Sequence, residues 1–238
     1  KGNFKKIISN DVVIITNNRI AHSVLPALIY MKIKKINCKV YVIAMGMFNS
    51  PKNLVLKKIH LFLNSFLLRY VNGLIFIGKK EYQFALKEFS KFKNKIEFIP
   101  FGVDDHFWKP IDDLNQTLKP IVFIGNDSNR DFDFLIELIK TTPEEQFIVV
   151  TEHFEDNFLN NLNLNNATFY KGSWNKEILT DEFIKEIYTR SKLTIVPLKN
   201  SIQPSGQSVS LQSISMNTPV IITKTDGFWD TEYFKDKK

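Results

Sequence analysis

The sequence predicts an α/β protein of two Rossmann-like lobes, each built around a parallel β-sheet. Short apolar runs alternate with segments of helical periodicity, which is the pattern of strand–helix–strand units. A second series of this kind begins after a stretch rich in Gly, Asp, Pro and Trp at 101–118. The 238 residues suffice for two domains of ordinary size. We therefore expect an N-terminal lobe over 1–115, a linker near 101–118 and a C-terminal lobe over 116–238.

The apolar runs are short and continuous, as expected of strands buried on both faces of a parallel sheet. In the first lobe we expect strands at 11–16, 39–44, 73–78 and 96–100, and helices at 21–34, 54–70 and 81–92. In the second lobe we expect strands at 121–124, 147–151, 168–170, 193–197 and 219–223, and helices at 132–140, 180–191 and 208–216.

Charge is divided unevenly between the two lobes. Residues 1–115 carry 19 Lys and Arg against 8 Asp and Glu, whereas the remainder carries 13 against 17. A basic lobe of this kind indicates an anionic surface as partner, and both nucleic acid and anionic lipid satisfy that condition. One cysteine, Cys38, allows no disulfide within the chain and fits a reducing compartment. No apolar run reaches the roughly 18 residues of a membrane span, and the N-terminus has no signal-peptide pattern.

The segment 54–70 admits two interpretations. Its apolar residues form a broad helical face flanked by Lys57, Lys58 and Arg69. Such a helix can lie in the interface of an anionic leaflet. Alternatively, it is a core helix whose apolar face packs on the sheet and whose lysines form a solvated edge.

Candidate binding residues follow the predicted strands of the second lobe, because ligands of open α/β sheets bind beyond the carboxyl ends of the strands. Gly125 directly follows the strand at 121–124 and permits a tight turn close to a ligand. Arg130 stands near the start of the next helix, where a cation gains nothing from the helix dipole. An anionic ligand shared with the helix end explains this placement, and so does a surface ion pair with Asp127 or Asp131.

Two further loops have suitable chemistry. Ser205, Gly206, Gln207 and Ser208 would place backbone N–H groups and hydroxyls at a helix N-terminus, which favours a phosphate group. After the strand at 168–170, Gly172 and Trp174 could flank a nucleobase, although Trp174 could equally be a packing residue.

Other chemistries find no support in the sequence. The four histidines have no metal-ligand spacing, and neither a phosphate-loop motif nor a G-x-G-x-x-G or G-x-S-x-G motif occurs. The aromatic residues lie in apolar contexts, so a surface that stacks nucleic-acid bases is not indicated.

Four segments, taken in order, resemble the family-4 glycosyltransferases of the GT-B fold. The segment 99–110 (IPFGVDDHFWKP) is similar to the interdomain signature of that family. The segments 121–136, 172–197 and 203–220 resemble the start of its second lobe, its tyrosine- and proline-containing element and its paired-glutamate element. The resemblance covers residues from about 70 to 230.

The sequence departs from the family pattern at several places. Gln203 and Gln212 stand where the family has paired glutamates, with eight residues between them instead of seven. Asn126 replaces a frequent arginine, and Met45-Gly46 replaces His-Gly. The first strand of the N-terminal lobe and the closing C-terminal helix are not recognisable, so we expect a chain truncated at both ends, with an incomplete N-terminal lobe.

The resemblance implies retaining transfer of a sugar from a nucleotide-diphosphate sugar to a surface polysaccharide or glycolipid acceptor. By that resemblance Arg130 and Gln203 are catalytic. The donor-binding residues implied are Gly125, Asn126, Arg130, Gly172, Trp174, Ser205, Gly206, Gln207, Ser208 and Gln212.

Metal ions and cofactors are not part of this expectation, because Arg130 and the helix end would stabilise the leaving phosphate. The partners expected are the donor, a glycan or lipid-linked acceptor and an anionic membrane surface, but not nucleic acid. The location expected is cytoplasmic, peripheral on the inner face of the cell membrane. The alternative is a catalytically lapsed nucleotide-sugar-binding or scaffold protein, suggested by the two glutamines.

Overall fold

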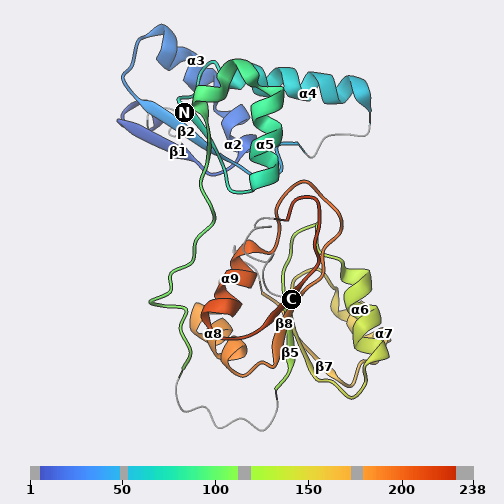
Figure 1. The fold of residues 1–238 in the computed structure, drawn as a ribbon. Helices are drawn as coiled ribbons and strands as arrows, with labels where there is room; N and C mark the ends of the chain where they lie inside the picture. Colours follow the sequence, from blue (N-terminus) through green and yellow to red (C-terminus); the bar gives the residue numbers. More distant parts are fainter. Residues whose placement is uncertain (1–5, 49–52, 112–118, 173–178, 229–238) are drawn as a thin grey trace. The chain divides into compact units, whose positions relative to one another are not determined.

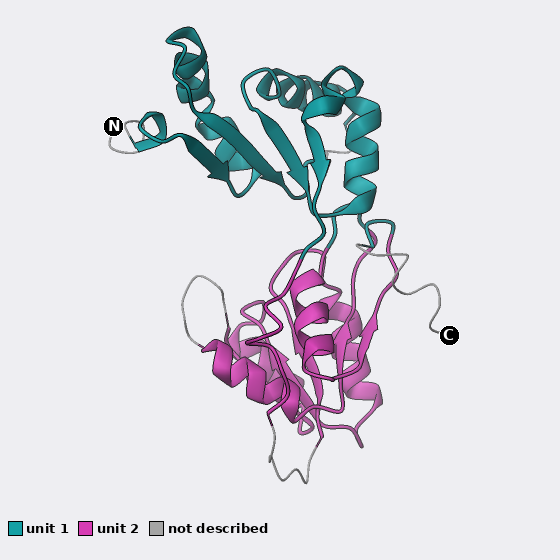
Figure 2. Ribbon diagram, turned by 60° about the vertical axis from the view of Figure 1, so that its left-hand side comes forward, with its two compact units in different colours: residues 1–101, 201–204, 226–238 teal, residues 102–200, 205–225 magenta. Residues whose placement is uncertain are grey.

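The computed structural model describes residues 6–48, 53–111, 119–172 and 179–228. The chain divides into two compact units (Figure 2). The N-terminal unit comprises Lys1–Phe101, Ser201–Pro204 and Asp226–Lys238, and the C-terminal unit comprises Gly102–Asn200 and Ser205–Thr225. The chain therefore enters the C-terminal unit at Gly102, within the predicted linker of 101–118.

The N-terminal unit is a four-stranded parallel sheet with its connecting helices (Figure 1). Its elements are β1 (Val12–Ile15), α2 (Asn18–Ser23), α3 (Leu25–Ile33), β2 (Lys39–Ala44), α4 (Leu54–Leu67), β3 (Gly73–Phe76), α5 (Lys79–Glu88), the 3-10 helix η1 (Ser90–Lys95) and β4 (Ile96–Phe98). The strands follow the order β1-β2-β3-β4, with Val42 paired to Leu74 and Phe76 to Phe98. The predicted parallel α/β class is confirmed.

The core of this unit forms where the strands are buried. Val40, Val42 and Ala44 of β2 are almost fully buried, and they join Leu74 and Phe76 of β3 in one hydrophobic cluster. α2 packs against β1 and β2, whereas α5 packs against β3 and β4. Among the described residues, no helix is both long and apolar enough to cross a lipid bilayer.

The sequence predicts one helix over 21–34, but the structure has two, α2 and α3. Val24 (φ −93°, ψ 3°) ends α2 and precedes α3. Pro26 lies in the first turn of α3, where a missing N–H group is tolerated. In one continuous helix, its ring would clash with the carbonyl of His22. The proline therefore explains the break.

A buried carboxyl group links the loop after β2 to the start of α5. Glu81 is fully buried, and its Oε2 accepts a hydrogen bond from the backbone N–H of Gly46 at 3.3 Å. Burial raises the pKa of Glu81 to about 7, although the backbone amides of residues 46–48 lower it in part. Glu81 therefore carries a proton in the folded unit under mildly acidic conditions.

This shift predicts a pH-dependent stability that Glu81→Gln removes. The folded state binds more protons than the unfolded state between about pH 4.5 and pH 7, so the free energy of unfolding falls as pH rises through that window. The total effect of this group is on the order of 3 kcal/mol. Urea unfolding at pH 5 and pH 8 should show a smaller difference for Glu81→Gln than for the parent. Glu97→Gln, at an exposed position of β4, is the control and should show the same difference between pH 5 and pH 8 as the parent.

The C-terminal unit is a five-stranded parallel sheet flanked by helices (Figure 1). Its elements are β5 (Ile121–Ile124), α6 (Phe132–Thr141), β6 (Phe147–Val150), α7 (Asp156–Leu162), β7 (Ala167–Tyr170), α8 (Asp181–Thr189), β8 (Leu193–Val196), α9 (Gln207–Ser215) and β9 (Val220–Ile222). The strand order is β7-β6-β5-β8-β9. α7 was not predicted from the sequence.

Successive residues of β5 pack into different clusters. Phe123 lies in a cluster with Leu135 and Ile139 of α6, whereas Val122 lies in a cluster with Ile187 of α8. Because neighbouring side chains of a strand point to opposite faces, these two helices cover the two faces of the sheet.

The segment expected to be a linker contributes to the second of these clusters. Trp108 is buried there with Tyr188, the two rings meeting edge to face at 6.0 Å between centroids. Val103 and Phe107 pack against the same cluster. This packing explains why residues from Gly102 onward belong to the C-terminal unit.

Candidate functional site

The strand order of the C-terminal unit places two loops beside each other. The chain runs from β5 through β6 to β7 on one side, and then crosses to β8 and β9 on the other side of β5. The order therefore reverses between β5 and β8. In open α/β sheets, ligands bind outside the carboxyl ends of the strands at such a switch point. The segments of the C-terminal unit found there are 125–131 after β5 and, after β8, 197–200 and 205–206.

Backbone hydrogen bonds fasten these two loops together. Asp131 N–H donates to Pro197 O at 3.0 Å, and Lys199 N–H donates to Asn129 O at 2.8 Å. Arg130 forms an isolated antiparallel bridge with Leu198. Asp131 also caps α6, because its carboxylate accepts from Phe134 N–H at 3.1 Å. The backbone of Arg130 is therefore held on both sides.

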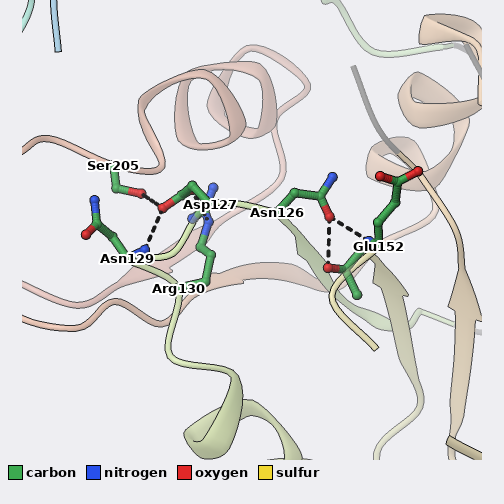
Figure 3. Close-up of polar contacts among 7 residues, drawn as sticks. Asn126, Asp127, Asn129, Arg130, Glu152 and Ser205 are labelled. Atoms are coloured by element: carbon green, nitrogen blue, oxygen red, sulfur yellow. Dashed lines mark hydrogen bonds and ion pairs between the residues drawn. The ribbon is translucent and has the colours of Figure 1, made fainter. Parts of the chain in front are cut away.

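The Arg130 side chain is buried, with 4% of its area exposed. Its Nε lies 3.0 Å from Oδ2 of Asp127 (Figure 3). Its Nη1 is buried and has no hydrogen-bond partner among the described residues. Burial lowers the pKa of Arg130, and the Asp127 carboxylate opposes that effect. A buried cation with an unsatisfied donor is costly, so this position favours an added anion.

Of the two interpretations of Arg130, the ion pair is observed in part, and the anionic ligand stays a prediction. The ion pair with Asp127 exists, but Arg130 is not a surface residue. Asp127 also accepts from Ser205 Oγ at 2.8 Å and from Asn129 N–H at 3.0 Å (Figure 3). From the sequence, Asp127 was expected solely as a possible partner of Arg130, and no motif indicates that it also connects the two loops.

The N-terminus of α9 lies against the Arg130 guanidinium. Gly206 is the N-cap residue and has φ +77°, a conformation that favours glycine. A Cβ atom on Gly206 would lie 2.5 Å from Cγ1 of Val196 and 3.0 Å from Nη1 of Arg130. The unpaired Nη1 of Arg130 therefore lies next to the N-cap residue of α9. Helix N-termini and arginine both favour phosphate groups.

Asn126 joins three strand-end loops. Its Oδ1 accepts from Glu152 N–H at 2.6 Å (Figure 3) and from Thr151 Oγ1 at 3.0 Å. Its Nδ2 donates to Gly172 O at 2.6 Å. These contacts engage the amide of Asn126 inside the protein. Gly172 is buried, and a Cβ there would lie 2.7 Å from Cγ1 of Val150. Trp174 lies outside the described residues.

Gln212 is buried inside the C-terminal unit. It is 7% exposed, and its Oε1 accepts from Tyr188 Oη at 3.4 Å. Burial raises the pKa of Tyr188, and the nearby Arg130 lowers it in part. Tyr188 is therefore close to both the Arg130 charge and the Gln212 amide. Gln207, the first residue of α9, is also buried, and Ser208 is half-buried.

The remaining predicted residues are distributed as follows. Gly125 lies against Arg130, since a Cβ there would come within 2.3 Å of Nε. Gln203 belongs to Ser201–Pro204, which is part of the N-terminal unit, and its N–H donates to Ser201 Oγ at 3.1 Å. Within the described residues, no group of three or more His, Cys, Asp or Glu side chains is arranged to hold a metal ion.

Comparison with known proteins identifies the fold. No protein-family model and no curated protein sequence matches the chain. The solved structure of HepE from Anabaena with UDP and glucose is similar, with a TM-score of 0.66 and 15% identity over 95% of this chain and 62% of that chain. A glycosyltransferase from Rickettsia africae has a TM-score of 0.63 and 19% identity over 95% of this chain and 62% of that chain.

The lipopolysaccharide outer core galactosyltransferase WaaB gives a TM-score of 0.53 and 14% identity over 94% of this chain and 60% of that chain. The chain thus spans less than two thirds of the length of each of these structures. Its fold is that of the GT-B glycosyltransferases, as the sequence predicted.

The close contact at Gly206 predicts a large effect of Gly206→Ala. The new methyl group would meet Val196 and Arg130, and the positive φ adds backbone strain, so we expect a loss of about 2 kcal/mol or more in the free energy of unfolding. Urea unfolding followed by circular dichroism measures this loss. Gly102→Ala is the matched control, because nothing lies within 4 Å of its added Cβ. Equal effects of the two substitutions would contradict the packing described.

Proposed function

We propose that the chain belongs to a retaining, family-4-type glycosyltransferase that takes a hexose from a nucleotide-diphosphate sugar. One observation carries the proposal. The buried Arg130 directs an unpaired Nη1 at the N-terminus of α9, at the switch point between β5 and β8. A diphosphate supplies the negative charge that this arrangement favours.

The donor would be held mainly by the two fastened loops. The diphosphate would contact Arg130 Nη1 and the backbone N–H groups of 206–208. Gln212, one turn into α9, would hydrogen-bond the ribose, since an amide can accept and donate as a hydroxyl requires. Gln203 would contact hydroxyls of the sugar. Asn126 would act indirectly by holding the loops at 151–152 and 172 in place.

The chemistry proposed needs charge stabilisation at the departing phosphate. As the glycosidic bond breaks, negative charge grows on the leaving diphosphate. Arg130 and the α9 N-terminus are fixed before the reaction and would stabilise that charge without a divalent metal. The low exposure of the guanidinium would strengthen its attraction to the leaving diphosphate, because little water screens the two charges.

The similar structures suggest which ligands to examine first. HepE has been solved with UDP-glucose, so UDP-sugars are the first donors to test. WaaB is an outer core galactosyltransferase of lipopolysaccharide, which suggests a surface polysaccharide or glycolipid acceptor. The other partner proposed is an anionic membrane surface, with the protein peripheral on its cytoplasmic side.

A catalytically lapsed nucleotide-sugar-binding or scaffold protein is the second candidate. Gln203 and Gln212 motivate it, because they replace the glutamates of the family pattern. Such a protein would bind the donor and leave it intact. A nucleic-acid-binding protein rests on the basic charge alone and has no structural support in the described residues.

Calorimetry against a panel of nucleotides and nucleotide-sugars tests the proposal. We expect one nucleoside diphosphate and its sugar derivative to bind, followed by slow release of sugar when donor and protein are incubated. Binding without any sugar release or transfer would favour the lapsed protein. No binding by any nucleotide would refute both candidates.

Substitution of Arg130 tests the donor site itself. Arg130→Ala removes a charge-assisted contact worth about 1.5–3 kcal/mol, so we expect nucleoside-diphosphate affinity to fall about 10- to 150-fold. Arg130→Met retains more side-chain volume and should give the same loss if the charge matters. Arg190→Ala is the control, because Arg190 is half-exposed and pairs with Glu186 on α8.

Each variant must show a cooperative melting transition above the assay temperature before its affinity is compared. Unchanged affinity in folded Arg130→Met would remove Arg130 from the donor site.

A further inference from the structure

Asp127 brings a negative charge to the place where the diphosphate is proposed to bind. Its Oδ2 lies 3.0 Å from Nε of Arg130, and its Oδ1 accepts from Ser205 Oγ at 2.8 Å (Figure 3). Ser205 directly precedes Gly206, the N-cap residue of α9. The carboxylate therefore contacts both the guanidinium and the residue that leads into the helix N-terminus, the two groups that favour phosphate.

The side-chain charges of the two fastened loops cancel. Segments 125–131, 197–200 and 205–206 contain two acidic and two basic residues, which are Asp127, Asp131, Arg130 and Lys199. Asp131 caps α6, and Lys199 is exposed. The side chain of Asp127 is 44% exposed, so its charge is open to solvent and to a ligand. A phosphate at Arg130 would therefore be attracted by this cation and repelled by the neighbouring carboxylate.

The ligands before and after sugar transfer differ in charge. In the transfer, the bond between the anomeric carbon and the phosphate oxygen breaks, and its electron pair stays on that oxygen. The anomeric carbon bonds instead to the acceptor hydroxyl oxygen, whose proton goes to solvent. The released nucleoside diphosphate has a free terminal phosphate, so above about pH 7 it carries about one negative charge more than the nucleotide-sugar. A fixed negative charge beside the phosphate site repels this product more than the donor.

We propose that Asp127 makes the donor site selective for the nucleotide-sugar over the nucleoside diphosphate that transfer releases. This role depends on the donor site proposed above. Arg130 and the N-terminus of α9 attract both ligands, whereas the Asp127 carboxylate opposes the additional charge of the product. Selectivity of this kind speeds the release of product, and it reduces the stabilisation of the charge that grows on the leaving phosphate.

The geometry allows the charge of Asp127 to be separated from its structural role. Oδ1 accepts both hydrogen bonds, from Ser205 Oγ at 2.8 Å and from Asn129 N–H at 3.0 Å, whereas Oδ2 pairs with Arg130. In Asp127→Asn the amide oxygen can take the place of Oδ1 and retain both hydrogen bonds. The variant therefore removes the negative charge and keeps the connection between the segments.

Calorimetry with matched pairs of ligands tests this selectivity. The pairs are UDP with UDP-glucose, GDP with GDP-mannose and ADP with ADP-glucose, at about pH 8 without divalent metal ions. For a pair that binds, we expect Asp127→Asn to raise the affinity for the diphosphate, relative to that for the nucleotide-sugar, by about fivefold or more. This difference between parent and variant should be smaller at about 0.5 M salt than at about 0.05 M, because salt screens the half-exposed carboxylate.

Three further variants serve as comparisons. Asp127→Ala removes the charge together with both hydrogen bonds, and it should shift the ratio of the two affinities in the same direction as Asp127→Asn. Asp127→Glu keeps the charge and should leave the ratio near that of the parent. Asp133→Asn removes an exposed carboxylate from the first turn of α6 and should not change the ratio. Each variant must melt cooperatively above the assay temperature before its ratio is compared.

The possible outcomes separate this role from the donor site itself. If the parent binds a pair and the ratio is the same in Asp127→Asn and Asp127→Ala, the donor site stands and the selectivity is overturned. An equal loss of affinity for both ligands would reduce Asp127 to a tie between the segments, and an equal shift in Asp133→Asn would assign the effect to net charge; either result overturns the proposal. If the parent binds none of the pairs, the donor site and the role of Asp127 are both refuted.

Discussion

The Asp127 carboxylate, which pairs with Arg130, connects the loops that follow β5 and β8. Asp127 holds Nε of Arg130 and also accepts from Ser205, so one carboxylate fixes both sides of the switch point. Gly206 allows the backbone at the start of α9 to approach Nη1, where any side chain would intrude. The guanidinium is thereby kept buried, charged and incompletely paired. A buried and incompletely paired guanidinium destabilises the folded unit, and a bound anion would offset that cost.

Neutral side chains replace charges around this cation. The amide of Asn126 is hydrogen-bonded to the loops at 151–152 and 172, and Gln212 lies beside Tyr188, which is itself close to Arg130. A glutamate at Gln212 would place a carboxylate in an almost dry environment near the guanidinium and would compete for its charge. With glutamine there, Arg130 keeps its ion pair with Asp127. The proposed donor site thus combines one buried cation with one helix N-terminus.

Much of the fold could be predicted from the sequence because strand and helix signals here are local. The bounds of β2 and β5 agree with the predicted 39–44 and 121–124, since each is a continuous apolar run between turn residues. The failures have identifiable causes. Pro26 divided a helix that periodicity alone had joined. α7 was missed because DNFLNNL has three asparagines, which are weak helix formers, and packing of its apolar residues stabilises it.

The sequence by itself determined the fold class, the positions of the two strand-end loops and the presence of Arg130, Ser205 and Gly206 within them. Those properties follow from apolar periodicity and from short segments of chain. The tertiary structure decided that Arg130 is buried, that Asp127 ties the loops together and that Asn126 faces inward. It also decided that α4 leaves a row of apolar side chains in solvent. These outcomes depend on which surfaces pack together, and periodicity cannot distinguish an apolar face that meets a sheet from one that meets solvent.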